Sequence, residues 1–199
     1  MGEKIIKVVL SFTIPWWLEK ALVAPVLLYR RVRYGYAFRR IALTQGKYAI
    51  VDPDDYYKLN EYKWCALKVG HKYYAVRSNG GRKGQKRKLY RMHREVVHIP
   101  KGLECDHING DSLDNRKANL RAATRQQNCW NNSKRKPKSL SKYKGVSFSK
   151  RGRPWKAMLT VNGKWIYLGG FNSEIQAAKA YDKAAKRYFG EFAVLNFKK

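Results

Sequence analysis

The chain has 199 residues, enough for one or two small domains, and 44% of them are hydrophobic, as in an ordinary folded protein. Its 43 Lys and Arg residues against 14 Asp and Glu give a formal net charge of +29, which points to nucleic acid or an anionic membrane as the partner. The odd cysteine count and the lack of a C-x-x-C pair argue against a zinc knuckle and a secreted disulfide framework; the cysteines are Cys65, Cys105 and Cys129.

Residues 1–40 read as an apolar and basic extension. The segment Ile5–Tyr29 is rich in Val, Leu, Ile and Trp, and arginines follow it, which is one way to build a membrane anchor with a basic flank. It is interrupted by charges and prolines, namely Lys7, Glu19, Lys20, Pro15 and Pro25. No span therefore reaches the roughly 18 to 20 apolar residues that a membrane helix needs. We favour a helix packed on the body, or an extension with little role, over membrane association.

Residues 41–94 are predicted to form a small mixed α+β unit. Tyr48–Val51 alternates like a strand, and Asp52-Pro53 begins a short helix to about Asn60, because proline is tolerated early in a helix. Three more strands are predicted, at Lys63–Leu67, Lys72–Arg77 and Arg87–Met92. A glycine-rich basic loop over Ser78–Lys86 precedes the last strand.

The densest group of candidate ligands and bases lies between Leu103 and Asn132. Five of the 14 acidic residues fall within Glu95 to Asp114, although the chain as a whole is basic. A carboxylate beside a histidine in such a chain suits a site where Mg²⁺ meets a phosphate, since Mg²⁺ takes oxygen ligands and only one or two from the protein. The histidine is then a candidate general base, because its pKa lies near working pH.

Local signals predict a strand, loop, strand and helix for this stretch. The strands are expected at Leu103–Asp106 and Leu120–Ala122, with Asn109-Gly110-Asp111 as a turn between them. Thr124 followed by Gln127 resembles a capping box that begins a helix.

This stretch resembles the HNH endonucleases of the homing type, in the branch where Asp and Asn replace the outer metal-binding histidines. The resemblance rests on Met92-His93-Arg94, Asp106-His107, Asn115, Asn119-Leu120-Arg121 and Asn128. It implies a ββα-metal fold in which Asp106 and Asn128 hold a divalent metal, His107 activates water and Asn119 braces the loop. His93 either touches substrate or packs. Taken singly, such residues are usually surface or turn residues, but together at the family's spacing they favour a site.

Basic residues flank the candidate site on both sides. From Arg77 to Arg94 there are eight Lys or Arg and no acid, and from Ser133 to Lys156 there are ten and no acid. The first run could be a solvated surface, but beside a nuclease site we expect it to hold a phosphate backbone without reading sequence. The second run is expected to track a phosphate strand between two modules. In this part of the chain we expect DNA contacts from Arg87, Arg91, Arg94 and Arg121. Residues 133–142 are predicted to be a basic linker.

The C-terminal residues 143–199 are predicted to form a three-stranded antiparallel sheet packed on one helix. Asn162-Gly163 is a strong hairpin signal between the second and third strands. A helix follows, with Ser173 and Gln176 as a capping box and Gly190 as the C-cap glycine. The ranges are Lys144–Ser149, Trp155–Val161 and Lys164–Phe171 for the strands and Ser173–Phe189 for the helix.

The same residues resemble the AP2 DNA-binding domain over about Ser141 to Phe197. The match includes Tyr143-Lys144-Gly145-Val146, Tyr167-Leu168-Gly169-Gly170-Phe171, Ala180-Tyr181-Asp182 and Leu195-Asn196-Phe197. The resemblance implies a sheet that enters the major groove. Where the plant regulators place several arginines, this chain has Lys144, Ser147, Thr160 and Trp165, which leaves the target sequence open. The candidate contacts are Lys144, Ser147, Arg151, Trp155, Lys156, Met158, Thr160, Trp165 and Tyr167; Trp155 could instead belong to the core.

The expectations combine into one α+β architecture: a small mixed N-terminal unit, a ββα-metal HNH unit and an AP2-type module. The boundaries are 1–40, 41–132 with the ββα-metal core at about 90–132, 133–142 and 143–199. We expect a monomeric, metal-dependent endonuclease acting on double-stranded DNA in the cytoplasm, on the nucleoid of a bacterial or phage-infected cell. Mg²⁺ is the expected metal, with Mn²⁺ as an alternative, and no small-molecule cofactor is expected. The rival hypotheses are a non-enzymatic AP2-type regulator with an inactive HNH scaffold, and a membrane-associated nuclease.

Overall fold

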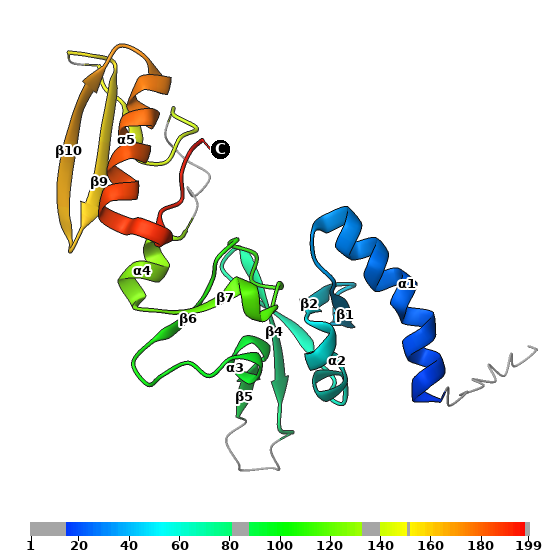
Figure 1. Ribbon diagram of the computed structural model, residues 1–199. Coiled ribbons are helices and arrows are strands. Elements are labelled where there is room, and N and C mark those ends of the chain that lie inside the picture. The colour runs from blue at the N-terminus through cyan, green and yellow to red at the C-terminus, as the bar shows by residue number, and fades with distance from the viewer. Residues whose placement is uncertain (1–14, 81–87, 133–139, 151, 198–199) are drawn as a thin grey trace, which may run out of the picture.

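The computed structural model describes residues 15–80, 88–132, 140–150 and 152–197, and over these ranges the protein is α+β. The C-terminal module lies at the opposite end of the molecule from the first helix, and the remaining elements lie between them (Figure 1). Three parts can therefore be described in chain order.

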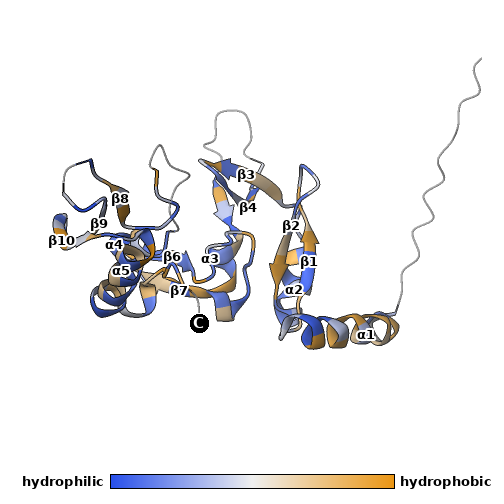
Figure 2. Ribbon diagram, turned by 90° about the horizontal axis from the view of Figure 1, so that it is seen from above, coloured by the Kyte–Doolittle hydropathy of each residue, from blue (hydrophilic) through white to orange (hydrophobic). Residues whose placement is uncertain are grey.

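Helix α1 (Trp16–Tyr34) projects from one edge of the molecule and ends at Gly35, whose φ of 81° is in the left-handed region (Figure 2). Glu19 joins the helix to the body through an ion pair of 2.9 Å with Arg39. Arg30 lies over the ring of Phe38 at 4.5 Å. Among the described residues, no helix combines the length and the apolar character required to cross a membrane.

The middle part is built from short strands around one apolar core. Strands β1 (Arg39–Ala42) and β2 (Tyr48–Val51) pair antiparallel, and helix α2 (Pro53–Asn60) follows. A second antiparallel sheet has the order β3-β4-β5, and the short helix α3 follows it; their bounds are Cys65–Val69, Lys72–Ser78, Leu89–Arg91 and Met92–Val96. The buried core between these elements includes Ile41, Val51, Leu59, Trp64 and Met92.

The next unit is a β-hairpin followed by a helix. Strands β6 (Glu104–His107) and β7 (Leu120–Ala123) pair antiparallel, with Asp106 opposite Arg121. The short 3₁₀ helix η1 (Lys117–Asn119) precedes β7, and α4 (Arg125–Trp130) follows it. Both bonds of the predicted capping box are present at the start of α4, which confirms that prediction. The loop between the strands is joined to β2 by Ile50, which accepts a bond from the Asn115 amide and donates one to Leu113.

The C-terminal module is the three-stranded antiparallel sheet β10-β9-β8 packed on helix α5, with the short 3₁₀ helix η2 after it. This arrangement confirms the predicted architecture of the module. The bounds are Val146–Phe148 for β8, Trp155–Val161 for β9, Lys164–Phe171 for β10, Glu174–Phe189 for α5 and Gly190–Phe192 for η2.

Two contacts explain why this module requires its sequence motifs. Gly145 has a φ of +72°, and a Cβ atom there would lie 1.9 Å from the ring of Tyr181, so only glycine fits. Asp182 on α5 accepts hydrogen bonds from the backbone amides of Asn196 and Phe197, which ties the chain after η2 to the helix.

Some element predictions were wrong in detail. Strand β1 and helix α3 were not predicted, and α3 begins at Met92, where the preceding strand was expected to end. Ser173 caps α5, but its side chain accepts from the amide of Ile175 rather than completing a box with Gln176. The strand bounds of β9 and β10 agree with the prediction at every residue.

Candidate active site

His107 lies at the end of β6 and is buried, with 6% of its surface exposed. Asn115 hydrogen-bonds its imidazole, while the buried Nε2 atom has no partner among the described residues. Because Nε2 has no such partner, we assign the Asn115 contact to Nδ1. Burial lowers the pKa of His107 below its ordinary value, against the raising effects of Asn115 and Asp106. A neutral imidazole with an unused Nε2 lone pair is the form that accepts a proton.

Asp106, next to His107, is buried and held on both carboxylate oxygens. Arg121 on the opposite strand donates from Nε to Oδ2 at 2.9 Å. Asn131, at the C-terminal end of α4, donates from Nδ2 to Oδ1 at 2.8 Å and also to the backbone oxygen of His107 at 2.7 Å. One asparagine therefore holds the candidate metal ligand and the candidate base together.

Asn128, the second expected ligand, contacts a different carboxylate. Its Nδ2 atom donates to Oε2 of Glu104 at 2.6 Å. Glu104 and Asp106 are two residues apart on β6, and Asn128 and Asn131 are three apart at α4, so each pair lies on one side of its element. Helix α4 therefore runs along β6 and contacts it through two pairs, Asn128 with Glu104 and Asn131 with Asp106. Because Nδ2 of Asn128 donates to Glu104, the amide oxygen of Asn128 faces away from the Glu104 carboxylate.

Asn119 is buried and makes two bonds across the loop between β6 and β7. Its Oδ1 accepts from the amide of Asn109 at 2.9 Å, and its Nδ2 donates to the backbone oxygen of Asp114 at 2.8 Å. Asp114 in turn forms an ion pair with Arg116 at 2.6 Å. These two bonds brace the loop, and the role of Asn119 in a reaction stays a prediction.

His93 packs beneath His107 rather than facing solvent. It is 4% exposed, and its ring centroid lies 5.3 Å from that of His107 at an angle of 84°. Tyr74 flanks both imidazoles, at 6.1 Å and 6.3 Å. Burial, followed by the repulsion of a charged His107, lowers the pKa of His93 to about 3, so it is neutral under ordinary conditions. Of the two roles considered for His93, the structure shows packing.

Arg91 and Arg94 are exposed on either side of the buried Met92-His93 pair, and both act electrostatically on His93. They therefore lie close to the site with their side chains open to solvent. Arg121 contacts Asp106 and is mostly covered. Arg87 and Arg151 lie outside the described residues.

The open face of the C-terminal sheet carries several of the expected DNA contacts. Ala157 and Leu159 on β9 are buried against α5, so Lys156, Met158 and Thr160 point to the opposite face. On the neighbouring strand, Trp165 and Tyr167 are 75% and 60% exposed and pair with Thr160 and Met158.

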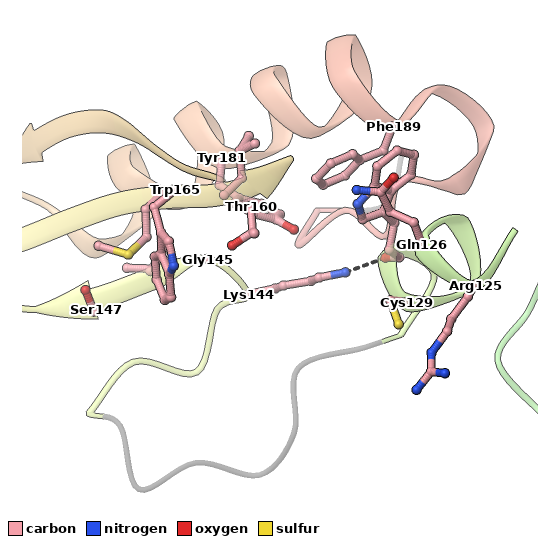
Figure 3. A pocket seen from close by; sticks show the side chains of 14 residues that line it. Arg125, Gln126, Cys129, Lys144, Gly145, Ser147, Thr160, Trp165, Tyr181 and Phe189 are labelled. Atoms are coloured by element: carbon pink, nitrogen blue, oxygen red, sulfur yellow. Dashed lines mark hydrogen bonds between the residues drawn. The ribbon is translucent and has the colours of Figure 1, made fainter. Parts of the chain in front are cut away.

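Two expected contacts are placed elsewhere. Trp155 packs against the buried core of the module, so the core alternative describes it. Lys144 donates from Nζ to the backbone oxygens of Trp130 and Asn132 at 2.6 and 2.7 Å, and burial lowers its pKa to about 8. It caps α4 instead of standing on the open face (Figure 3).

A cavity of about 720 Å³ lies where α4 meets the open face of the sheet (Figure 3). Ser147, Met158, Thr160 and Trp165 line it from the sheet, and Arg125 and Gln126 line it from the first turn of α4. The cavity therefore joins the open face of the sheet to α4.

Sequence reasoning missed the supporting role of four residues: Glu104, Asn115, Asn131 and Lys72. Lys72 acts electrostatically on His107 and donates to Oδ1 of Asn132 at 3.1 Å. Asn131 could have been suspected from its position one helical turn after Asn128. Asn115 stands in the motif itself, whereas Glu104 and Lys72 meet their partners through contacts between segments far apart in sequence.

Comparison with known proteins agrees with this geometry. A family model described as HNH endonuclease matches residues 95–129. The protein "Uncharacterized HNH endonuclease L560" of Acanthamoeba polyphaga mimivirus is 33% identical over 159 residues, which are 80% of this chain and 80% of that protein. The chain belongs to the HNH endonuclease family.

The HNH endonuclease also carries a C-terminal AP2 domain, because relatives of that class match a C-terminal stretch. The "AP2-like ethylene-responsive transcription factor TOE2" of Arabidopsis thaliana is 44% identical over 66 residues, 33% of this chain and 14% of that protein. "Protein 3.8" of Escherichia phage T7 is 43% identical over 67 residues, 33% of this chain and 54% of that protein. The chain spans less than two thirds of these two relatives.

HNH endonucleases generally use a divalent metal. Within the described ranges, no group of three or more His, Cys, Asp or Glu side chains is placed to hold a metal ion. The donor set at this site is instead the carboxylate of Asp106, contacted by Asn131, with Glu104 and Asn128 paired to each other nearby. Such a set fits a hard cation that keeps most of its water, and it does not fit zinc, which is usually held by several nitrogen or sulfur ligands.

Proposed function

We propose that this protein is a metal-dependent DNA endonuclease of the homing type that hydrolyses phosphodiester bonds and is targeted by its AP2 sheet. The observation that carries the proposal is the buried Nε2 of His107, which has no hydrogen-bond partner in the described part of the chain and lies in the residue next to a carboxylate held by Arg121 and Asn131. A buried polar atom without a partner is costly in a fold, which favours a role for it in function.

His107 is the proposed general base. Its Nδ1 side is fixed by Asn115, so the ring presents Nε2 to a water molecule and takes the proton as that water attacks phosphorus. Burial keeps the imidazole neutral at pH 7, which is the form that can accept the proton. His93 and Tyr74 pack around the ring and hold its plane.

Asp106 and the amide oxygen of Asn128 are the proposed metal ligands, with Mg²⁺ or Mn²⁺ as the ion. The ion, when bound, stabilises charge on the phosphoryl group and on the leaving oxygen. Glu104 orients the Asn128 amide, and Asn131 and Arg121 orient Asp106. Residues that hold the ligands in this way commonly decide metal affinity.

The DNA duplex is proposed to lie across both parts of the protein. Lys156, Met158, Thr160, Trp165 and Tyr167 would face the groove from the open side of the sheet. The cavity shared with α4 extends this surface to the nuclease unit. Arg91 and Arg94 would then hold the backbone close to His107.

The homing assignment is supported by relatives in a virus and a bacteriophage, where mobile nucleases are useful. We further propose a monomer that acts on double-stranded DNA in the cytoplasm, without a small-molecule cofactor. The rival function is a DNA-binding regulator with an inactive nuclease scaffold. The intact arrangement of His107, Asp106 and Asn131 favours the enzyme, since a scaffold has no need of an unpartnered Nε2.

The test is conversion of supercoiled plasmid by the purified protein with Mg²⁺, Mn²⁺ or EDTA. Asp106→Ala removes the proposed ligand, and Asp54→Ala, an exposed carboxylate on α2, is the matched control. We expect nicked or linear DNA with metal only, lost in Asp106→Ala and kept in Asp54→Ala. Tight binding without cleavage, on plasmids and on DNA flanking the protein's own gene, would favour the regulator.

A further inference from the structure

The AP2 domain contacts the nuclease unit at a small interface that we call the module joint, made of Arg121 and Trp130 on one side and Phe189, Glu191 and Phe192 on the other. Arg121 is its centre and is only 13% exposed at the side chain. The same guanidinium that holds Asp106 also reaches η2 of the C-terminal module.

Arg121 makes its contacts with different atoms on different sides. Nε donates to Asp106, and Nη1 donates to the backbone oxygen of Glu191 at 3.1 Å. Oε2 of Glu191 lies 3.5 Å from Nη1. The ring of Phe192 lies 3.7 Å from the central carbon of the guanidinium, within the range of a cation–π contact. The buried Nη2 has no hydrogen-bond partner among the described residues.

The joint has a second contact that keeps the two parts together. Trp130 at the end of α4 stacks on Phe189 at the end of α5, with ring centroids 4.5 Å apart and planes 20° apart. Lys144 adds its two bonds to the same end of α4. The position of Arg121 relative to η2 is therefore fixed by contacts that do not involve Arg121.

We propose that the Glu191-Phe192 segment of the AP2 domain is a positioning element for the nuclease site, acting on Asp106 through Arg121. If only Asp106 held it, the long side chain of Arg121 would adopt several conformations. Contacts with Phe192 and Glu191 restrict it to one conformation, in which Nε faces the carboxylate. The nuclease site is complete only when the C-terminal domain is docked. This inference rests on the proposed function, which assigns Asp106 to the reaction.

The test uses the full chain with Phe192→Leu, which keeps an apolar side chain in a buried position but removes the aromatic face. Phe192→Tyr keeps that face and is the rescue variant. Tyr188→Leu, at a partly exposed aromatic on α5, is the matched control. The readouts are the single-turnover cleavage rate and the DNA dissociation constant, measured separately, together with a double-mutant cycle against Arg121→Lys.

We expect Phe192→Leu to slow cleavage roughly five- to tenfold, because this factor corresponds to the energy of one cation–π contact. DNA affinity should be unchanged. Phe192→Tyr and Tyr188→Leu should cleave as the wild type does. In the Arg121→Lys background, Phe192→Leu should have little further effect, because Phe192 acts through the guanidinium. Additive effects, or a Phe192→Leu variant with the wild-type rate, would overturn the proposal.

Hydrogen–deuterium exchange of the β6 and β7 peptides gives a readout that does not require activity. Exchange there should increase in Phe192→Leu and stay unchanged in Tyr188→Leu. Should the wild type fail to cleave any DNA, the proposed function fails, and the exchange result still shows whether η2 positions Arg121. Unchanged exchange in Phe192→Leu would contradict the inference even in an active enzyme.

Discussion

Asn131→Leu should destabilise the nuclease unit strongly, because this buried side chain satisfies two acceptors at once. The substitution removes the bond to Oδ1 of Asp106 and the bond to the backbone oxygen of His107. A hydrogen bond to a charged group contributes about 1.5–3 kcal/mol, and the second bond contributes about 0.5–1.5 kcal/mol, because the His107 oxygen still accepts from the Gly110 amide. A cavity of about 470 Å³ that Asn131 lines can admit water to the freed groups. The expected loss is therefore about 2–4 kcal/mol.

The measurement is the free energy of unfolding in urea, made in EDTA so that no metal contributes. Asn128→Leu is the matched control, since it removes a single bond, to the half-buried Glu104. We expect the control to lose about 1–2 kcal/mol. If Asn131→Leu is no less stable than Asn128→Leu, the assignment of Asn131 as the residue that holds Asp106 and His107 together is refuted.

Three further predictions concern other parts of the molecule. Gly145→Ala should destabilise the C-terminal module by about 2–5 kcal/mol, because a Cβ atom would meet the Tyr181 ring in a backbone of positive φ; a melting curve that matches Gly152→Ala, at an open turn glycine, would contradict this. The cleavage rate should stay level at neutral pH and above and fall only below about pH 6.5, because burial lowers the pKa of His107 and the base works deprotonated. A loss of rate that begins above pH 7 would be inconsistent with His107 as the base. Lys144, followed by NMR of protein labelled with ¹³C-lysine, should titrate near pH 8, below the ordinary lysine value of 10.5. The pKa of Lys144 is lowered in the folded state, so between pH 8 and pH 10.5 the unfolded chain binds one more proton than the folded chain. The free energy of unfolding should therefore rise with pH over this range. In Lys144→Met this rise should be lost.

Elements with strong local signals could be predicted from sequence alone. The Asn162-Gly163 turn set the register of β9 and β10, and Thr124 with Gln127 marked the start of α4. Both signals act through the residues beside them, so no knowledge of distant contacts was needed. Strand β1 and helix α3 were missed because each is short and is held by tertiary packing around Ile41 and Met92.

The candidate site could be predicted only as far as its motif extends. Asp106, His107 and Asn119 were found because they lie close together in the chain. The partners that orient them were not, since Arg121 and Asn131 reach Asp106 by strand pairing and by the direction of α4. Lys144 was expected on the DNA-facing side of the sheet, but its bonds to the end of α4 depend on how the two parts dock.

The single-turnover cleavage rate of His107→Ala tests the central claim most directly. His98→Ala, at an exposed histidine, is the control, and DNA binding is measured in the same samples. The account predicts a loss of about 10²–10⁴-fold in rate for His107→Ala, with DNA affinity and the His98→Ala rate unchanged. Equal cleavage by the two variants would contradict the assignment of His107 as the general base.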